Sequence, residues 1–183
     1  MPSLVYGELL KGVDWSSLSS SEQEYIINQD EMISKAIANI LSIAPGSIKD
    51  TTSVKGFRKS YSKQKHIFHS EKINVGGISA HAIVNHRAFG KNGKITKAIF
   101  SSEIHYSSSS MANFRNKQSV TSDERARGYH ANLRAGMKGL YDLSIHEMAH
   151  TFNQSKAIGV APSVFSRMEE SRADSFLKEI RGF

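Results

Sequence analysis

The chain has 183 residues, 39% of them apolar, a net charge of +7 and no cysteine. The lack of cysteine excludes disulfide bonds, thiolate zinc sites and a cysteine nucleophile. No apolar stretch approaches the roughly 18 residues that span a bilayer, and the N-terminus lacks the basic leader and apolar core of a signal peptide. We therefore expect a soluble protein, either cytoplasmic or exported by a non-classical route, whose oligomeric state the sequence leaves open.

The first predicted element is an amphipathic helix within residues 19–43, where apolar residues recur at helical spacing. Pro45-Gly46 ends it, and residues 49–64 have the polarity and scattered glycine of a loop. Three short runs of strand character follow, at His66–Ser70, Ile78–Asn85 and Ile95–Tyr106. We expect them to form a small antiparallel sheet with a hairpin turn at Asn92-Gly93.

Charge is unevenly distributed over these elements. Residues 1–50 contain three Lys and Arg against seven Asp and Glu, whereas residues 51–100 contain ten against Glu71 alone. The basic segment, residues 55–97, can attract nucleic acid, an anionic membrane or an acidic protein. Aromatic residues are sparse in it, so we favour a solvated face docked on the acidic N-terminal part over a nucleic-acid surface.

Residues 107–130 are polar and rich in serine, and we expect them to form a long surface loop or flap. A helical pattern returns near Leu133 and includes two histidines. After a break at residues 159–162, a last helix is expected from Ser163 or Ser166 to Ile180.

These elements predict an α+β fold with a small antiparallel or mixed sheet, an N-terminal helix, a histidine-bearing helix and a C-terminal helix. The length fits one domain, residues 1–183. We divide it into an N-terminal lobe of about residues 1–150, which ends in the histidine-bearing helix, and a small C-terminal subdomain of about residues 151–183.

The motif with the clearest chemistry is His146-Glu147-Met148-Ala149-His150. Residues four apart on an α-helix share a face, so both imidazoles can reach one metal ion. Glu147 lies beside such an ion without coordinating it, where its carboxylate can take a proton from a metal-activated water. The motif predicts a catalytic zinc site with Glu147 as general base. The alternative is an amphipathic helix whose histidines are satisfied in the core.

A catalytic zinc ion needs a third protein ligand. Three and six residues after His150, where metzincins have a glycine and a histidine, the chain has Asn153 and Lys156. Further on, Glu170 and Asp174 are four residues apart on the last predicted helix. There the glutamate can coordinate the ion while the aspartate accepts a hydrogen bond from the far nitrogen of a ligating histidine.

Glu169 is the rival third ligand. It has Ala173 four residues on, so only Glu170 has a carboxylate partner at helical spacing. A solvated charged helix over residues 167–181 is the alternative without a metal.

The His-Glu-x-x-His motif, followed about twenty residues later by Glu170-Ser171-Arg172-Ala173-Asp174, resembles the gluzincin zinc metallopeptidases over about residues 137–180. This resemblance implies a zincin-like fold. It also implies that His146, His150 and Glu170 bind Zn²⁺, that Glu147 is the general base and that Asp174 supports a ligating histidine.

The same resemblance implies how a peptide substrate lies. In this group a strand at the edge of the sheet pairs with extended substrate by backbone hydrogen bonds. The strand Ile95–Tyr106 is the candidate, and the residues nearest the cleft are Ser101, Ser102, Glu103, Ile104, His105 and Tyr106. An edge or central strand with no ligand is the alternative.

Related enzymes also place a tyrosine, histidine or arginine donor to stabilise the oxyanion. We favour Tyr129 or His130, because a polar flap that ends at the helix start can bring them over the metal; surface loop positions are the competing interpretation. The other candidates are Arg172, Arg167 and Tyr106.

The remaining histidines show no second metal site. His66 and His69 are three apart in an expected strand and so lie on opposite faces, in surface or loop positions. For His81, His86 and His105 we expect structural or solvated roles.

The leading interpretation is a zinc-dependent endopeptidase, a bacterial or phage protein that hydrolyses protein or peptide substrates. The second is a metal-stabilised zincin-fold binding or assembly module that uses residues 55–97 on an acidic or nucleic-acid partner, without efficient catalysis. The third is a basic nucleic-acid binder without metal, and nucleic acid is the less favoured partner.

Overall fold

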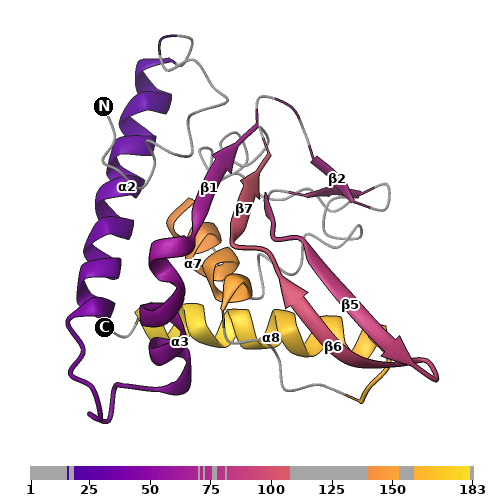
Figure 1. The fold of residues 1–183 in the computed structure, drawn as a ribbon. Helices are drawn as coiled ribbons and strands as arrows, with labels where there is room; N and C mark the ends of the chain where they lie inside the picture. Colours follow the sequence, from indigo (N-terminus) through magenta and orange to yellow (C-terminus); the bar gives the residue numbers. More distant parts are fainter. Residues whose placement is uncertain are drawn as a thin grey trace.

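The computed structural model describes residues 16, 19–69, 71, 73–75, 78–80, 82–107, 140–152 and 159–181. It shows an α+β protein with long helices and short strands (Figure 1). Helix α7 (Leu140–Thr151) packs against both α2 (Ser20–Leu41) and α8 (Pro162–Arg181). The α+β class, the N-terminal helix and the C-terminal helix are therefore confirmed.

Helix α2 is amphipathic, as its sequence predicts. Ile33, Ile37 and Ile40 recur three to four residues apart and are buried, so one face of the helix packs into the core. The chain turns after α2 near Gly46, whose φ of 79° is a conformation that glycine adopts without strain.

Residues 49–64, expected to be a loop, contain a helix, α3 (Thr52–Ser60). Thr51 caps it, because its hydroxyl accepts a hydrogen bond of 3.3 Å from the Val54 N–H. Val54 and Phe57 are both fully buried. Burial against the other helices stabilises this short helix, whose composition alone does not predict it.

The 3₁₀ turn η3 (Tyr61–Lys63) leads from α3 into the strands. Within the described residues the strands form three small sheets, with orders β1-β7-β4, β2-β3 and β5-β6. The strands are β1 (Lys65–Phe68), β2 (Ile73–Val75), β3 (Ile78–Ala80), β4 (Ala82–Ile83), β5 (His86–Lys91), β6 (Lys94–Phe100) and β7 (Glu103–Tyr106).

The strand boundaries differ from those predicted. The run Ile95–Tyr106 contains two strands, β6 and β7, which are interrupted at Ser101 and Ser102. Strand β7 pairs in parallel with β1 and antiparallel with β4, so its sheet is mixed. The strand order depends on pairing between segments about forty residues apart, which local patterns do not report.

The predicted hairpin is confirmed between β5 and β6. Asn92 and Gly93 both have positive φ, 54° and 72°, as the tight turns of two-residue hairpins require. The register shifts between Phe89 and Gly90. A Cβ on Gly90 would lie 2.8 Å from the Lys94 carbonyl oxygen, so this close approach of the strands requires glycine.

One buried cluster joins side chains from α2, α3, β7, α7 and α8. Phe57 lies within it, with its ring centroid 5.7 Å from that of Phe152 and 6.1 Å from that of Phe176. Phe152 follows the end of α7 and Phe176 lies on α8. This aromatic contact therefore helps to fix the two helices that carry the predicted metal ligands.

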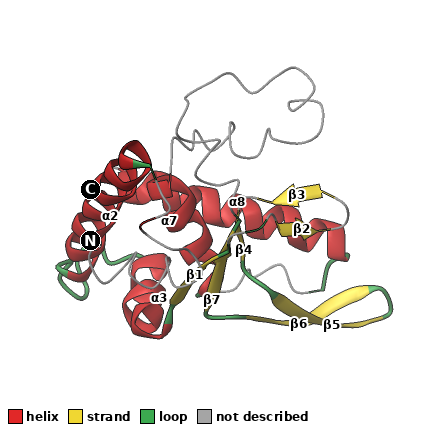
Figure 2. Ribbon diagram, turned by 90° about the horizontal axis from the view of Figure 1, so that it is seen from above, coloured by secondary structure: helices red, strands yellow, loops and turns green. Residues whose placement is uncertain are grey.

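Among the described residues, no helix combines the length and apolar character that crossing a lipid bilayer requires. Most of the predicted loop at residues 107–130 and the first turns of the predicted histidine-bearing helix lie outside the described residues. Figure 2 shows the same elements from above, with the β5–β6 hairpin extending away from α2, α3 and α7 and lying beside α8.

Candidate metal centre

Helix α7 carries the His-Glu-x-x-His motif in a buried position. His146, Glu147 and His150 are 4%, 8% and 6% exposed. Every residue of α7 from position 142 to 150 is buried. Ile145 and Met148 pack into the core, so the helix is covered on more than the histidine side. The imidazole centroids are 4.9 Å apart, so the four-residue spacing brings the rings together as the sequence predicts.

Glu170 on α8 reaches both histidines. Its Oε2 lies 3.0 Å from His146 Nε2, and its Oε1 lies 3.3 Å from His150 Nε2. The two Nε2 atoms are 3.3 Å from each other. The Glu170 side chain is 56% exposed, so this group faces solvent on one side. His146, His150 and Glu170 form a group that could hold a metal ion.

The outer nitrogen of each imidazole faces a second carboxylate from α8. His150 Nδ1 donates to Glu169 Oε1 over 3.2 Å. His146 Nδ1 lies 2.9 Å from Asp174 Oδ1, although these atoms are not aligned as a linear hydrogen bond. Because a carboxylate only accepts, it favours the proton on Nδ1 and leaves the Nε2 lone pair facing Glu170.

The spacing of the four inner atoms, the two Nε2 atoms and the two Glu170 carboxylate oxygens, is compatible with a small divalent ion. Around an ion bound at about 2.0–2.1 Å, neighbouring ligand atoms lie about 2.9–3.4 Å apart, from octahedral to tetrahedral geometry. The two Nε2 atoms are 3.3 Å apart, and each has a different Glu170 oxygen near it, at 3.0 Å for His146 and 3.3 Å for His150. Two lone pairs and a carboxylate at these distances repel one another unless a positive charge lies among them.

The pKa values of both histidines are raised, which means that the surrounding groups favour their positively charged forms. Burial alone would lower the pKa of His146, but its contacts with Asp174 and Glu170 raise it to about 9. Burial would likewise lower the pKa of His150, and Glu169 and Glu170 raise it to about 10. Burial would raise the pKa of Glu170, yet the two histidines hold it below its ordinary value. The carboxylates around the two imidazoles therefore favour positive charge at this group, which could hold a metal ion.

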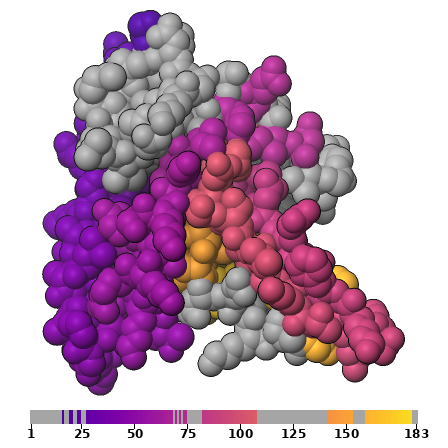
Figure 3. All heavy atoms as spheres, in the orientation of Figure 1, coloured from indigo at the N-terminus to yellow at the C-terminus, as the bar shows by residue number. Residues whose placement is uncertain are grey.

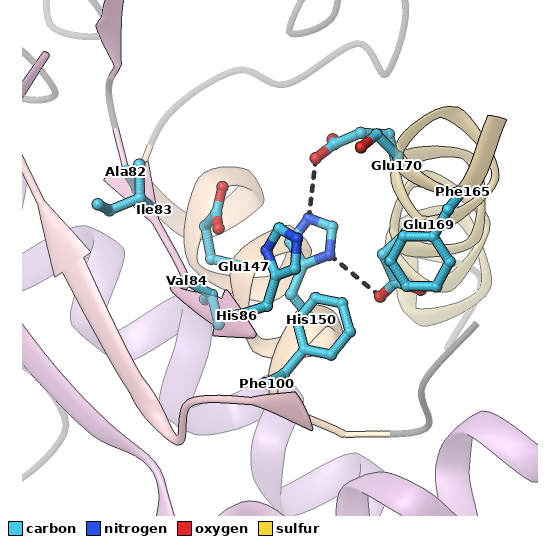
Figure 4. Close-up of a pocket in the computed structure, with 11 residues that line it drawn as sticks. Ala82, Ile83, Val84, His86, Phe100, Glu147, His150, Phe165, Glu169 and Glu170 are labelled. Carbon is cyan, nitrogen blue, oxygen red and sulfur yellow. Dashed lines mark hydrogen bonds and ion pairs between the residues drawn. The ribbon is translucent and has the colours of Figure 1, made fainter. Parts of the chain in front are cut away.

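A cavity of about 170 Å³ lies beside the histidines (Figure 4). One side is formed by β4 and the residue that follows it, and the other by aromatic rings. Its lining residues are Ala82, Ile83, Val84, His86, Phe100, Glu147, His150, Phe165, Ser166, Glu169 and Glu170. In Figure 4 the Glu147 carboxylate lies on the β4 side of the His86 and His150 rings. Burial raises the pKa of Glu147 above its ordinary value, so it binds a proton more readily than an exposed glutamate.

Arg172 is not placed as an oxyanion donor. Its guanidinium donates to both carboxylate oxygens of Glu169 and to the carbonyl oxygens of Ala149 and Phe152 at the end of α7. These bonds tie α8 to α7 and direct the side chain away from the cavity, whose lining it does not join. Glu169, the rival third ligand, contacts the outer nitrogen of His150 and Arg172 and thus supports the group from outside.

The predicted substrate strand is not an edge strand. Strand β7, which contains Glu103–Tyr106, lies between β1 and β4 and pairs with both. Ile104 and Tyr106 are fully buried, and the Tyr106 hydroxyl lies 2.9 Å from His66 Nδ1. Tyr106 is thus excluded as an exposed oxyanion donor. The strand on the cavity side of this sheet is β4.

The structure places some of the other predicted oxyanion donors and histidines, and the rest lie outside the described residues. Tyr129, His130 and His81 lie outside the described residues, and Arg167 is exposed. His66, expected at the surface, is buried against Tyr106. His69 Nε2 lies 2.8 Å from His105 Nδ1, and His105 Nε2 lies 3.3 Å from Glu103, so this chain of contacts does not converge on one point.

The aromatic side of the cavity, formed by His86, Phe100 and Phe165, was not predicted from the sequence. His86 stacks on Phe100 at 5.1 Å, and Phe100 lies 6.4 Å from His150, centroid to centroid. Phe165 joins them at 6.3 Å from Phe100. Helical spacing was an available signal for Phe165, because it precedes Glu169 by four residues on α8. No local signal links His86 or Phe100 to α7.

Comparisons with protein-family models, curated proteins and solved structures each found no match to this chain. The function therefore has to be argued from the geometry of the site.

Proposed function

We propose that this chain is a zinc-dependent peptidase of the gluzincin type, with a zincin-like fold. The observation that carries the proposal is the convergence of His146, His150 and Glu170 within hydrogen-bond distance, next to a cavity that also contains Glu147. A site that only stabilises the fold has no use for a buried glutamate in an adjoining cavity.

The donor types favour zinc among divalent ions. Two imidazoles and one carboxylate are a donor set of catalytic zinc sites, whereas Mg²⁺ and Ca²⁺ prefer oxygen ligands alone. His146, His150 and Glu170 would hold the ion, and Asp174 and Glu169 would orient the two rings. When bound, zinc supplies a Lewis acid that polarises a carbonyl oxygen and lowers the pKa of water.

Glu147 is the proposed general base. Its carboxylate accepts a proton from the attacking water and then delivers that proton to the leaving amine. A pKa raised by burial suits both steps, because the carboxylate must bind the proton and release it near neutral pH.

The proposed peptide-docking strand is β4 instead of β7. Within the described part of the chain it is one of the two outer strands of its sheet, and Ala82 and Ile83 line the cavity. An extended peptide that adds to β4 by backbone hydrogen bonds would run past Glu147.

His86 is the proposed oxyanion donor. It lines the same cavity as Glu147 and His150, and its ring is held by stacking on Phe100. An imidazole N–H aimed into a cavity can stabilise the negative charge that develops on a carbonyl oxygen.

The test compares the native chain with Glu147→Gln. Both are loaded with zinc, metal content is measured by elemental analysis before and after a chelator, and hydrolysis of casein is followed. We expect equal zinc content of one ion per chain, removed by the chelator, and hydrolysis by the native chain alone. Zinc binding without hydrolysis by either form would instead favour a metal-stabilised binding module. A chain that takes up no zinc would contradict both.

A further inference from the structure

The β5–β6 hairpin is a positively charged projection, which we call the cationic arm (residues 86–100; Figure 3). It contains Arg87, Lys91, Lys94 and Lys97 and no acidic residue. All four cations are exposed, and none forms an ion pair with a described residue. The structure therefore divides the basic segment predicted from the sequence: four of its ten cations lie on this one ribbon, separate from the cations of α3.

One face of the cationic arm alternates cations with large apolar side chains. The cross-strand pairs are Arg87 with Ile99 and Phe89 with Lys97, and paired residues point to the same face of the ribbon. Phe89 is 49% exposed and Ile99 is 43% exposed. An exposed face of this composition fits a partner that carries both negative charges and apolar groups.

The cationic arm is fixed relative to the candidate metal centre. The Ile95 N–H donates to the Val160 carbonyl over 2.8 Å, and the Gly159 N–H donates back to the Ile95 carbonyl over 2.6 Å. Ile95 and Ala98 pack on Phe165 of α8, the helix that carries Glu170. At the base of the arm, His86 and Phe100 line the cavity itself. A chain bound in the cavity could therefore continue along the arm.

We propose that the cationic arm binds acidic segments of the polypeptide substrate and delivers them to the candidate metal centre. This inference rests on the proposed peptidase function and adds a substrate class: unfolded polypeptide with glutamate or aspartate next to apolar residues. The arm raises the local concentration of such chains by charge attraction.

Three features favour polypeptide over nucleic acid or an anionic membrane. The cavity at the base of the arm is lined by the carboxylates of Glu147, Glu169 and Glu170, which repel negative charge. A nucleic acid carries a phosphate at every nucleotide, whereas a polypeptide can present an uncharged stretch to the cavity while its acidic residues lie on the arm. Phe89 is the single aromatic residue on the exposed face, whereas single-stranded nucleic acid binds to series of aromatic rings. Within the described residues β5 pairs only with β6, so its other edge offers backbone hydrogen bonds to an extended chain.

The test measures binding separately from hydrolysis. Full-length chain with Glu147→Gln is titrated, by fluorescence anisotropy, into a labelled unstructured peptide rich in glutamate with interspersed phenylalanine. The arm variant adds Arg87→Gln, Lys91→Gln, Lys94→Gln and Lys97→Gln. The matched control adds Lys55→Gln, Lys59→Gln, Lys63→Gln and Lys65→Gln, which removes the same charge from α3 and its surroundings, where all four residues are exposed.

We expect the arm variant to weaken peptide binding about tenfold and the control less than about twofold, because each exposed ion pair contributes a few tenths of a kcal/mol. The tip variant Lys91→Gln/Lys94→Gln, which leaves the strands intact, should weaken it about threefold. A peptide with glutamine in place of glutamate should bind equally weakly to all variants. Circular dichroism checks that each variant is folded.

Equal losses in the arm variant and the control would overturn the proposal, because binding would then follow net charge alone. Tighter arm-dependent binding of duplex DNA or of phosphatidylserine vesicles, at the same ionic strength, would overturn the assigned partner. Casein hydrolysis by the active chain separates the two proposals. If peptide binding depends on the arm but no form hydrolyses casein, the binding role of the arm is supported and the peptidase function is refuted. If casein is hydrolysed but peptide binding does not depend on the arm, the peptidase function is supported and the role of the arm is refuted.

Discussion

Glu170→Gln is the substitution that tests the geometry of the candidate metal centre most directly. Glutamine keeps the size of the side chain but removes its negative charge, because an NH2 group replaces one carboxylate oxygen and the other becomes a neutral carbonyl oxygen. In the native chain these oxygens lie 3.0 and 3.3 Å from the two Nε2 atoms. The substitution therefore replaces the charged third ligand with a weak neutral one and leaves the two imidazoles and their outer carboxylates in place.

The expected loss of zinc affinity can be bounded from the carboxylates around the histidines. Removing an outer partner of a ligating histidine typically costs 10–100-fold in metal affinity, and Asp174→Asn should fall in that range. Glu170 is placed as a direct donor, so its loss should exceed about 100-fold, which corresponds to about 2.7 kcal/mol. Competition with a chromophoric zinc chelator at fixed pH measures both variants.

Glu169→Gln is the matched control, because it alters the neighbouring carboxylate. Glu169 is only 3% exposed and pairs with both Arg172 and His150. Breaking a buried pair is strongly destabilising, by about 3–5 kcal/mol, whereas the half-exposed Glu170 contributes less. Urea unfolding of the metal-free proteins should thus show a larger loss for Glu169→Gln. If zinc affinity is unchanged in Glu170→Gln but falls by more than 100-fold in Glu169→Gln, the assignment of Glu170 as the third ligand is refuted.

Three further predictions concern other parts of the molecule. His86→Asn should lower kcat for casein by about 10²–10³-fold without changing zinc content, and an unchanged kcat would remove His86 from the oxyanion role. The hydrogen bond from the Gly46 N–H lowers the pKa of Asp50 below its ordinary value. Burial opposes this shift, and the positive charge of Arg58 adds to it. The stability that these two contacts contribute is present above the unfolded pKa of about 3.9 and is lost as the pH falls through the lowered folded pKa; acid unfolding of Asp50→Asn should show a shallower loss than the native chain, and parallel curves would contradict this. Phe57→Ala should destabilise the chain by about 3–5 kcal/mol in urea unfolding, since the ring is fully buried between helices, and a loss below 1 kcal/mol would show that the core closes around the gap.

The parts of the site that depend on helical period could be predicted from the sequence. The spacing of His146 and His150 fixes their common face, and the spacing of Glu170 and Asp174 does the same on α8. The role of Glu169 could not be predicted, because it depends on how α8 is rotated against α7. That rotation is set by contacts such as Phe57 with Phe176, between residues more than a hundred positions apart.

The fold was predictable to a similar extent. Helix α2 has a long apolar stripe, and the Asn92-Gly93 turn has a distinct local signature. Helix α3 was missed because only Val54 and Phe57 mark its buried face. The central place of β7 was missed because strand order is decided by which distant strands pair, β1 in one direction and β4 in the other.

The contacts of Arg172 bear on how the candidate metal centre would take up an ion. Arg172 joins Glu169 to the backbone at the end of α7, and the shared apolar cluster packs the same two helices together. The donor atoms are thus preorganised by bonds that need no ion, unlike those of small domains that fold only when zinc arrives. If the proposed ion binds there, it could leave and return as conditions change while the rest of the chain stays folded.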